Sequence, residues 1–173
     1  MRNIELKARL DGLQHAEEVA ASLATHALGT QRQVDTYFHV PCGRLKLRQI
    51  DGRAAQLVWY QRASEPGAKA SDYQLVPIAH PETLKQALSA ALGVRAVVDK
   101  RRTIYLYENV RIHLDEVVGL GTFLEFEAVL EAVDDEARGY DQIAHLSARF
   151  GLSDADRVAA SYGELILDRP GAA

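Results

Sequence analysis

Basic residues occupy alternate positions in two segments of the sequence. Arg44, Lys46 and Arg48 are separated by leucines, and Lys100 and Arg102 repeat the same spacing. Residues two apart in a β-strand point to the same face, so each segment predicts a strand with one cationic face. Arginine forks and lysine ammonium groups placed side by side in this way are suited to binding phosphate oxygens.

Acidic residues show the same alternation further along the chain. Glu125 and Glu127 flank Phe126, so the two carboxylates share one face of a predicted strand and the aromatic ring takes the other. Carboxylate oxygens are preferred ligands of hard cations such as Mg²⁺ and Mn²⁺. A cationic surface together with a carboxylate pair therefore indicates a phosphate ligand bridged by a metal ion.

Three further segments place polar residues two apart. They are Glu5 with Lys7 and Arg9, Tyr60 with Arg62, and Arg111 with His113 and Asp115. On a single strand such residues would simply face water, as they do on many half-buried sheets. Across six strands, like charges on neighbouring positions repel unless a counter-ion lies between them, which favours a shared site for an anion and a cation.

The elements that carry these residues are predicted from hydrophobic spacing and turn residues. Strands are expected over residues 4–10, 33–40, 44–50, 55–62, 72–78, 94–108, 110–118 and 122–130. Helices are expected over residues 13–28, with Gly29 as the end signal, 81–92, 136–150 and, as a shorter tail, 153–167. Strands joined mostly by turns pair antiparallel. The predicted fold class is α+β, an eight-stranded antiparallel β-tunnel, closed or nearly closed, with flanking helices.

The bulk properties limit the class of protein. A chain of 173 residues fits a single domain, residues 1–173. The net charge of −4 argues against a nucleic-acid partner, which would need an excess of basic residues. No window approaches the roughly 20 apolar residues that span a bilayer, so no membrane partner is expected. The lone Cys42 suits a reducing compartment, and a cytoplasmic location is expected.

Several short motifs resemble those of the CYTH superfamily, which joins class IV adenylyl cyclases to thiamine triphosphatases. They are Asn3-Ile4-Glu5-Leu6-Lys7, Asp35-Thr36-Tyr37-Phe38, Arg44-Leu45-Lys46-Leu47-Arg48, Lys100-Arg101-Arg102, Arg111-Ile112-His113-Leu114-Asp115 and Glu125-Phe126-Glu127. The resemblance covers nearly the whole chain and comes nearest to the class IV adenylyl cyclase branch. It implies a triphosphate tunnel metalloenzyme, whose lumen binds a triphosphate.

The resemblance also implies roles for individual residues. The metal ligands for Mg²⁺ or Mn²⁺ would be Glu5, Asp115, Glu125 and Glu127. The phosphate ligands would be Lys7, Arg44, Lys46, Arg48, Arg62, Lys100, Arg102 and Arg111. The residues on which catalysis depends would be Glu5, Lys7, Glu125 and Glu127. One position departs from the signature, because Asn3 stands where the family has its first glutamate. This amide either weakens the metal site or lies at a frayed strand end without effect.

Three functions follow from this resemblance. The first is an adenylyl cyclase that converts ATP to cyclic AMP and pyrophosphate. The second is a hydrolase of tripolyphosphate, a nucleoside triphosphate or thiamine triphosphate. The third is a non-catalytic module that binds a polyphosphate or a nucleotide. Proteins of this kind often pair, so a homodimer is also compatible with the sequence.

Five other side chains are placed by the same alternation. His113 is expected to be a hydrogen-bonded spacer on a polar face rather than a general base. Trp59 and Phe126 take the opposite parity to the charged residues, which predicts core aromatics outside the tunnel. Tyr37 and Tyr60 are expected to reach the lumen.

Overall fold

The computed structural model describes residues 1–52, 54–131 and 136–169. Within these residues the strands are β1 (Arg2–Leu10), β2 (His26–Phe38), β3 (Arg44–Ile50), β4 (Ala54–Arg62), β5 (Lys69–Pro77), β6 (Val94–Tyr107), β7 (Val110–Val117) and β8 (Gly121–Leu130). The helices are α1 (Gln14–Leu23), α2 (Pro81–Leu92), α3 (Glu136–Arg149) and α4 (Tyr162–Leu167), with a 3₁₀ turn, η2, over Asp154–Asp156. Within the described ranges, these helices are too short or too polar to cross a membrane.

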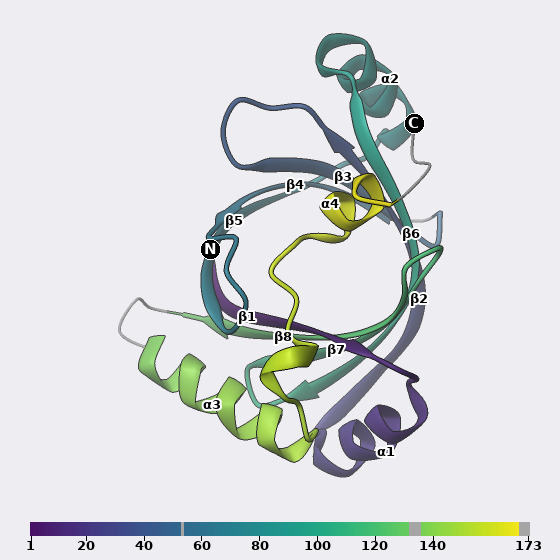
Figure 1. Cartoon of the computed structure of the whole chain (residues 1–173). Coiled ribbons are helices and arrows are strands. Elements are labelled where there is room, and N and C mark those ends of the chain that lie inside the picture. The colour runs from purple at the N-terminus through teal and green to yellow at the C-terminus, as the bar shows by residue number, and fades with distance from the viewer. Residues whose placement is uncertain (53, 132–135, 170–173) are drawn as a thin grey trace.

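The eight strands close into an antiparallel barrel (Figure 1). Their order around the barrel is β1-β5-β4-β3-β2-β6-β7-β8. Strands β2 to β5 form a meander, and so do β6 to β8. The barrel is closed by three pairings between strands distant in sequence, β2 with β6, β1 with β5, and β1 with β8. The predicted β-tunnel is confirmed.

The barrel carries most of its hydrophobic core on its outer surface. Ile4 and Leu6 of β1 and Phe126 of β8 point outward and pack, fully or almost fully buried, in a cluster that includes Ile143 of α3. Helices α1 and α3 lie outside the barrel on this side (Figure 1). A Cβ at Gly139 would lie only 2.9 Å from Ile4 Cγ1, so glycine allows α3 to approach the sheet closely. Burying each large side chain here contributes about 1.5–3 kcal/mol.

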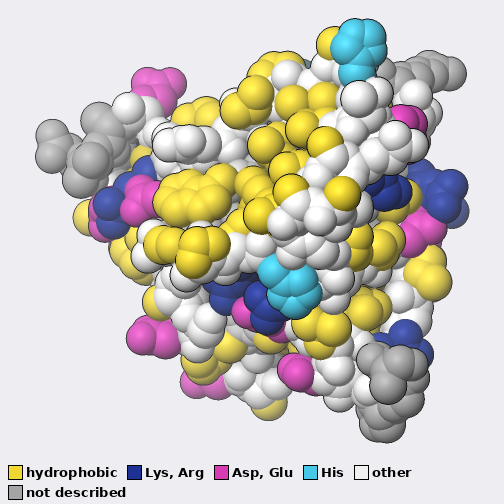
Figure 2. Space-filling model, turned by 90° about the horizontal axis from the view of Figure 1, so that it is seen from above, with side chains coloured by type: hydrophobic (Ala, Val, Ile, Leu, Met, Phe, Trp, Pro, Cys, Tyr) yellow, Lys and Arg dark blue, Asp and Glu magenta, His cyan; other side chains and the backbone are white. Residues whose placement is uncertain are grey.

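The opposite wall of the barrel has a thinner cover. Leu84 and Leu88 of α2 pack against a small cluster that contains Phe38 and Leu47. Figure 2 views the molecule from above, and apolar side chains are spread across this face. Trp59 points outward from β4 as predicted, but it is only partly buried and donates a hydrogen bond from Nε1 to the Cys42 carbonyl oxygen. The inward face of the barrel carries charged side chains together with tyrosines and a few aliphatic residues such as Val58 and Leu75.

The helix predicted over residues 13–28 was too long. Helix α1 ends at Leu23, and β2 begins at His26 and pairs with β6. Gly29 therefore does not end a helix; it lies at a register shift of this ladder with a φ of +86°, a value that favours glycine. Pairing with a distant strand overrides the local helical spacing, which no single-segment pattern reveals.

The C-terminal segment is not the continuous helical tail predicted over residues 153–167. Ser153 and Ser161 each start a capping box with the acidic residue three positions later, so two separate starts divide the segment. The stretch between η2 and α4 is extended and crosses one mouth of the barrel (Figure 1). There the Val158 N–H donates to the Lys7 carbonyl oxygen at 2.9 Å.

Candidate active site

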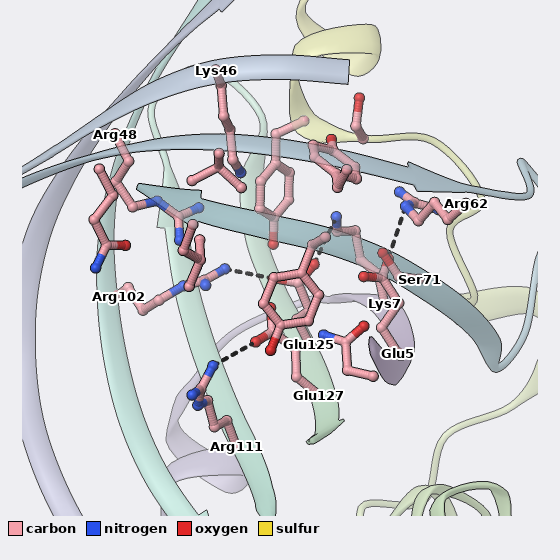
Figure 3. Close-up of a pocket in the computed structure, with 18 of the residues that line it drawn as sticks. Glu5, Lys7, Lys46, Arg48, Arg62, Ser71, Arg102, Arg111, Glu125 and Glu127 are labelled. Atoms are coloured by element: carbon pink, nitrogen blue, oxygen red, sulfur yellow. Dashed lines mark hydrogen bonds and ion pairs between the residues drawn. The ribbon is translucent and has the colours of Figure 1, made fainter. Parts of the chain in front are cut away.

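A cavity of about 140 Å³ lies inside the barrel (Figure 3). Its charged lining residues are Glu5, Lys7, Lys46, Arg48, Arg62, Lys100, Arg102, Arg111, Glu125 and Glu127. Its uncharged lining residues are Asn3, Tyr37, Gln56, Val58, Tyr60, Ser71, Tyr73, Leu75, Ser161 and Tyr162. Most of the charged positions predicted from the sequence therefore converge on one space, and the predicted lumen positions of Tyr37 and Tyr60 are confirmed.

One basic wall of the cavity is organised by Asp35, a fully buried residue of β2. Its carboxylate accepts two hydrogen bonds from Arg48, at 2.8 and 2.9 Å. The ammonium groups of Lys46 and Lys100 donate to the same carboxylate at 3.1 and 2.9 Å. Burial opposes ionisation of Asp35, but the three cations outweigh it and hold the pKa of the carboxyl well below its usual range. One negative charge thus gathers three positive charges, which leaves an excess available to an anion.

Lys100 is the cation most affected by this crowding. Its side chain is almost fully buried, and burial together with the nearby charges of Arg48 and Arg102 lowers its pKa to about 7, against the attraction of Asp35. A bound polyanion would act in the opposite direction, because a negative charge favours the protonated amine. The charge of Lys100 is therefore coupled to what occupies the cavity.

The acidic residues lie on β1 and β8, where Glu5 is directly opposite Glu127 and Lys7 is opposite Glu125. Lys7 Nζ lies 3.0 Å from Glu125 Oε1, and Arg62 Nε lies 2.8 Å from Glu5 Oε1. Burial raises the pKa of Glu5 in spite of Arg62. The pKa of Glu125 is instead well below its usual range, because Lys7 and Arg102 together outweigh its burial. The carboxylates thus meet on one side of the cavity (Figure 3).

Asp115 does not share this wall of the cavity. Both of its oxygens accept hydrogen bonds from the buried Arg102, at 2.7 and 2.6 Å, and the Tyr162 hydroxyl donates to it at 2.8 Å. Arg102 Nη2 also donates a hydrogen bond to Glu125 Oε2, at 2.5 Å. Asp115 consequently orients Arg102 from behind, and its oxygens are occupied by protein donors.

Arg44 is likewise placed apart from the other predicted phosphate ligands. It lines a smaller adjoining pocket and pairs with Glu164 of α4 at 2.9 Å. Although Arg44 shares the parity of Lys46 and Arg48, it lies at the first residue of β3, where α4 covers the barrel end. Its present contacts hold the C-terminal helix against the barrel.

Position 3 lies within the cavity rather than at a frayed end. Asn3 is paired with Ser71 on one side and Val129 on the other, and only 5% of the residue is exposed. Its Oδ1 atom is buried and has no hydrogen-bond partner among the described residues. The substitution of the signature glutamate therefore changes a residue that lines the site.

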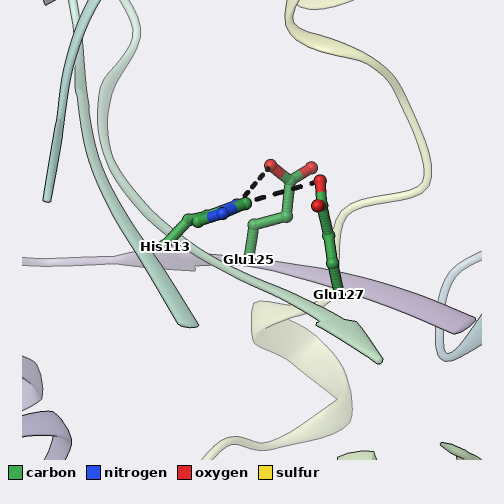
Figure 4. A group of neighbouring side chains, drawn as sticks. All are labelled: His113, Glu125 and Glu127. Atoms are coloured by element: carbon green, nitrogen blue, oxygen red, sulfur yellow. Dashed lines mark ion pairs between the residues drawn. The ribbon is translucent and has the colours of Figure 1, made fainter. Parts of the chain in front are cut away.

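His113 is the unexpected member of the acidic wall (Figure 4). Its Nδ1 atom lies 3.8 Å from Glu125 Oε2 and 3.8 Å from Glu127 Oε1. Only 3% of the residue is exposed, and Nδ1 has no hydrogen-bond partner in the described part of the chain. Burial and the charge of Arg102 lower the pKa of the imidazole, which favours its neutral form. The expectation of a hydrogen-bonded spacer was wrong for this nitrogen.

Comparison with known proteins assigns the architecture to a family. The sequence matches the profile of the CYTH domain over residues 1–162. The chain belongs to the CYTH domain family. CYTH proteins act on triphosphates and depend on metal ions in general. A cavity that joins basic groups to carboxylates agrees with this class of ligand.

Individual CYTH relatives match this chain along almost its full length. The protein described as putative adenylate cyclase MJ0240, from Methanocaldococcus jannaschii, is 25% identical over 95% of this chain and 98% of its own. The solved PH1012 protein of Pyrococcus horikoshii superposes with a TM-score of 0.82 at 24% identity, covering 94% of this chain and 98% of that one. A Hippeastrum protein, HpAC1, described as a putative adenylyl cyclase with a dominant triphosphatase activity, gives a TM-score of 0.63 at 16% identity, covering 95% and 94%.

Sequence reasoning left the roles of Asp35, His113 and Tyr162 in this CYTH site unrecognised. Asp35 belonged to a motif noted only for its resemblance, although its parity with Tyr37 places it in the lumen. The parity of His113, which matches that of Arg111, indicates the lumen. The sequence does not give the register of β7 against β8, and this register places His113 opposite Glu125. Tyr162 carried no signal in the sequence, because its position depends on how the C-terminal segment crosses the barrel.

Proposed function

We propose that this protein binds ATP in the barrel and, with a divalent metal ion, converts it to cyclic AMP and pyrophosphate. The observation that supports this most strongly is the cavity in which seven basic side chains face three carboxylates. Asp35 and Asp115 lie directly behind the basic groups, so the described site keeps a formal excess of two positive charges when Lys100 is protonated. A triphosphate with its metal ion has the complementary arrangement of charge.

The phosphate oxygens would be bound from several strands at once. We assign Lys7, Lys46, Arg48, Arg62, Lys100, Arg102 and Arg111 to this role. Arg48 and Arg102 are each fixed by two hydrogen bonds to a buried aspartate, so their remaining N–H groups are already oriented. Donors held in place before the substrate arrives stabilise charge in the transition state without the cost of reorganisation. Arg44 is assigned to holding α4 instead.

The residues present fit a divalent metal ion on the acidic wall. Glu5, Glu125 and Glu127 supply carboxylate oxygens, and Glu127 has no cation closer than Arg111, at 3.6 Å, among its described ion pairs. Asp115, expected as a fourth ligand, is left out of the proposal because it does not line the cavity and lies behind Arg102, with three hydrogen bonds from Arg102 and Tyr162. When bound, the ion would neutralise phosphate charge and polarise the phosphorus under attack.

In the cyclase reaction the ribose 3′-hydroxyl oxygen forms a bond to the α-phosphorus and gives up its proton to water, and the bond from that phosphorus to the bridging oxygen of pyrophosphate breaks. Negative charge grows on the leaving pyrophosphate, where Arg48, Lys46 and Lys100 would stabilise it. The nucleoside needs a less charged surface, and Val58 and Leu75 line the same cavity. Their presence beside the basic wall supports a substrate that is part phosphate and part nucleoside.

Hydrolysis of a triphosphate is the second candidate. Basic side chains come from β1, β3, β4, β6 and β7, so a terminal phosphate would be surrounded as fully as an inner one. In this case water instead of the ribose hydroxyl attacks the terminal phosphorus, the bond from that phosphorus to the bridging oxygen breaks, and the diphosphate leaves while inorganic phosphate and a proton are released. The triphosphatase activity in the description of the Hippeastrum protein supports keeping this alternative.

Product analysis separates these candidates. Purified protein is incubated with ATP or with tripolyphosphate under Mg²⁺ and then Mn²⁺, and cyclic AMP, pyrophosphate and phosphate are resolved by chromatography. The wild-type protein is expected to form cyclic AMP from ATP, and Glu127→Gln is expected to form none. Phosphate without cyclic AMP would overturn the cyclase in favour of the hydrolase, and tight binding without turnover would leave a binding module. Glu116→Gln is the matched control, since Glu116 is exposed on the outer face of β7, where it pairs with Arg101.

A further inference from the structure

We infer that His113 is a metal ligand, and that with Glu125 and Glu127 it forms a site for a divalent transition ion rather than an all-oxygen site for Mg²⁺. The inference rests on the proposed function, because it refines which ion the same cavity uses. It concerns a residue that the sequence pattern assigned to a structural role.

The geometry of the three side chains carries this inference. One donor atom from each residue falls within a group whose members all lie within 4.8 Å of one another. The two distances from His113 Nδ1, each 3.8 Å, are too long for hydrogen bonds. Ligands of one ion, each at about 2.1 Å from it, lie about 3–3.6 Å apart, so shifts of a few tenths of an ångström to about 1 Å would close the site.

An unpartnered buried nitrogen gives independent support. A buried polar atom without a hydrogen bond carries a desolvation penalty and is rare in folded proteins. His113 Nδ1 is such an atom among the described residues, and it points toward two carboxylates (Figure 4). A histidine nitrogen that carries no proton is a common metal ligand. A bound ion would supply the partner that the protein does not.

The carboxylates of Glu125 and Glu127 can bind the metal ion without giving up their present contacts. Lys7 approaches Glu125 through Oε1, and Arg102 approaches it through Oε2. Each carboxylate oxygen has two lone-pair directions, so Oε2 can accept from Arg102 and also bind an ion. Glu127 is less engaged, with Arg111 at 3.6 Å. The donor set of this group is then one imidazole nitrogen and two carboxylate oxygens, with positions left open for Glu5 and for phosphate.

The change at position 3 acts in the same direction. An amide in place of the signature carboxylate removes one charged oxygen from the cavity lining, which weakens binding of a hard ion. An imidazole nitrogen adds affinity for mid-row transition ions, whose order of binding rises from Mn²⁺ to Co²⁺ and beyond. Together Asn3 and His113 shift the preference of the site away from Mg²⁺.

The test uses full-length protein without a histidine tag and the ions Co²⁺, Mn²⁺ and Mg²⁺ alone. Calorimetry is expected to give a Co²⁺ affinity that falls at least tenfold in His113→Asn, while the Mg²⁺ affinity changes less than threefold. His145→Asn, on the exposed face of α3, is the matched control and should leave both affinities unchanged. Equal losses for Co²⁺ and Mg²⁺, or no loss for either, would overturn the inference.

A spectroscopic measurement keeps the inference testable if the variant is unstable. Pulsed electron paramagnetic resonance of Mn²⁺ bound to the wild-type protein is expected to show coupling to an imidazole ¹⁴N nucleus. The experiment is run with Mn²⁺ alone and with Mn²⁺ plus pyrophosphate, which contains no nitrogen. Absence of the coupling in both samples would refute a histidine ligand even if the enzyme turns over triphosphate. Presence of the coupling without turnover would support the site and refute the proposed reaction.

Discussion

Replacing Asp35 by asparagine tests the organisation of the basic wall. Asp35 is fully buried and holds Arg48, Lys46 and Lys100 within 3.1 Å, so the isosteric change leaves two buried lysines and the partly buried Arg48 without their shared counter-charge. Removing one partner of a buried ion pair costs about 3–5 kcal/mol. For a chain of this length each kcal/mol lowers Tm by about 2–4 °C, so a fall of about 6–20 °C is expected.

The assay for this variant is thermal unfolding with and without tripolyphosphate. An anion that occupies the cavity replaces the lost negative charge, so tripolyphosphate should raise the Tm of Asp35→Asn by more than it raises that of the wild type. Asp99→Asn is the matched control, because Asp99 pairs with Arg32 on the outer, solvent-exposed face of β6 and β2. Exposed pairs contribute about 0–1 kcal/mol, so this control should change Tm by no more than about 4 °C.

Two results would refute the reasoning about Asp35. A loss of stability no larger than that of the Asp99 variant would mean that the three cations do not depend on this carboxylate. A triphosphate-induced rise in Tm that is smaller in Asp35→Asn than in the wild type would mean that the anion does not take the place of Asp35 among them.

Three further predictions follow from residues of the cavity, the C-terminal helix and the outer core. Triphosphate binding at pH 8 should take up a proton, because Lys100 has a pKa of about 7 before binding and gains a polyanion beside it; calorimetry in two buffers of different ionisation enthalpy measures this, and Lys100→Met should abolish it. Glu164 has its pKa lowered to about 2 by Ser161 and Arg44 in spite of burial, so its stabilising contribution is present above pH 4.5 and is lost as the pH falls toward 2. Urea unfolding of Glu164→Gln across this range should therefore depend less on pH than that of the wild type. Phe126→Ala should lose about 3–5 kcal/mol in urea unfolding, because the ring is fully buried outside the barrel, while the triphosphate affinity of the folded protein stays unchanged.

The sequence predicted the barrel well where local patterns and topology agree. The helix over Pro81–Leu92 was placed correctly, since proline at its start and Gly93 after its end are strong signals. Alternation correctly assigned most charged residues to the lumen, because residues two apart on a strand share a face and one face of every strand in a closed barrel is the lumen. The end of α1 was missed, because residues from His26 onward form a strand only through their pairing with β6.

The site could be predicted only as far as parity reaches. Parity gives the face of a strand but neither the register with its neighbours nor the position along the tunnel. Arg44 and Asp115 therefore had the right face, yet one is held by α4 and the other lies behind Arg102. The grouping of His113 with Glu125 and Glu127 needed the β7 and β8 register, which spacing along one strand does not contain.

The most direct test of a triphosphate site in the barrel is a calorimetric titration of Arg48→Gln with tripolyphosphate in the presence of Mn²⁺. Arg48 lines the cavity, and its loss leaves Asp35 still paired with two lysines. A charged hydrogen bond contributes about 1.5–3 kcal/mol, so the affinity should fall about tenfold or more. Arg101→Gln, on the exposed face of β6, should bind as the wild type does. Equal affinities for Arg48→Gln and the wild type would contradict binding of the triphosphate inside the barrel.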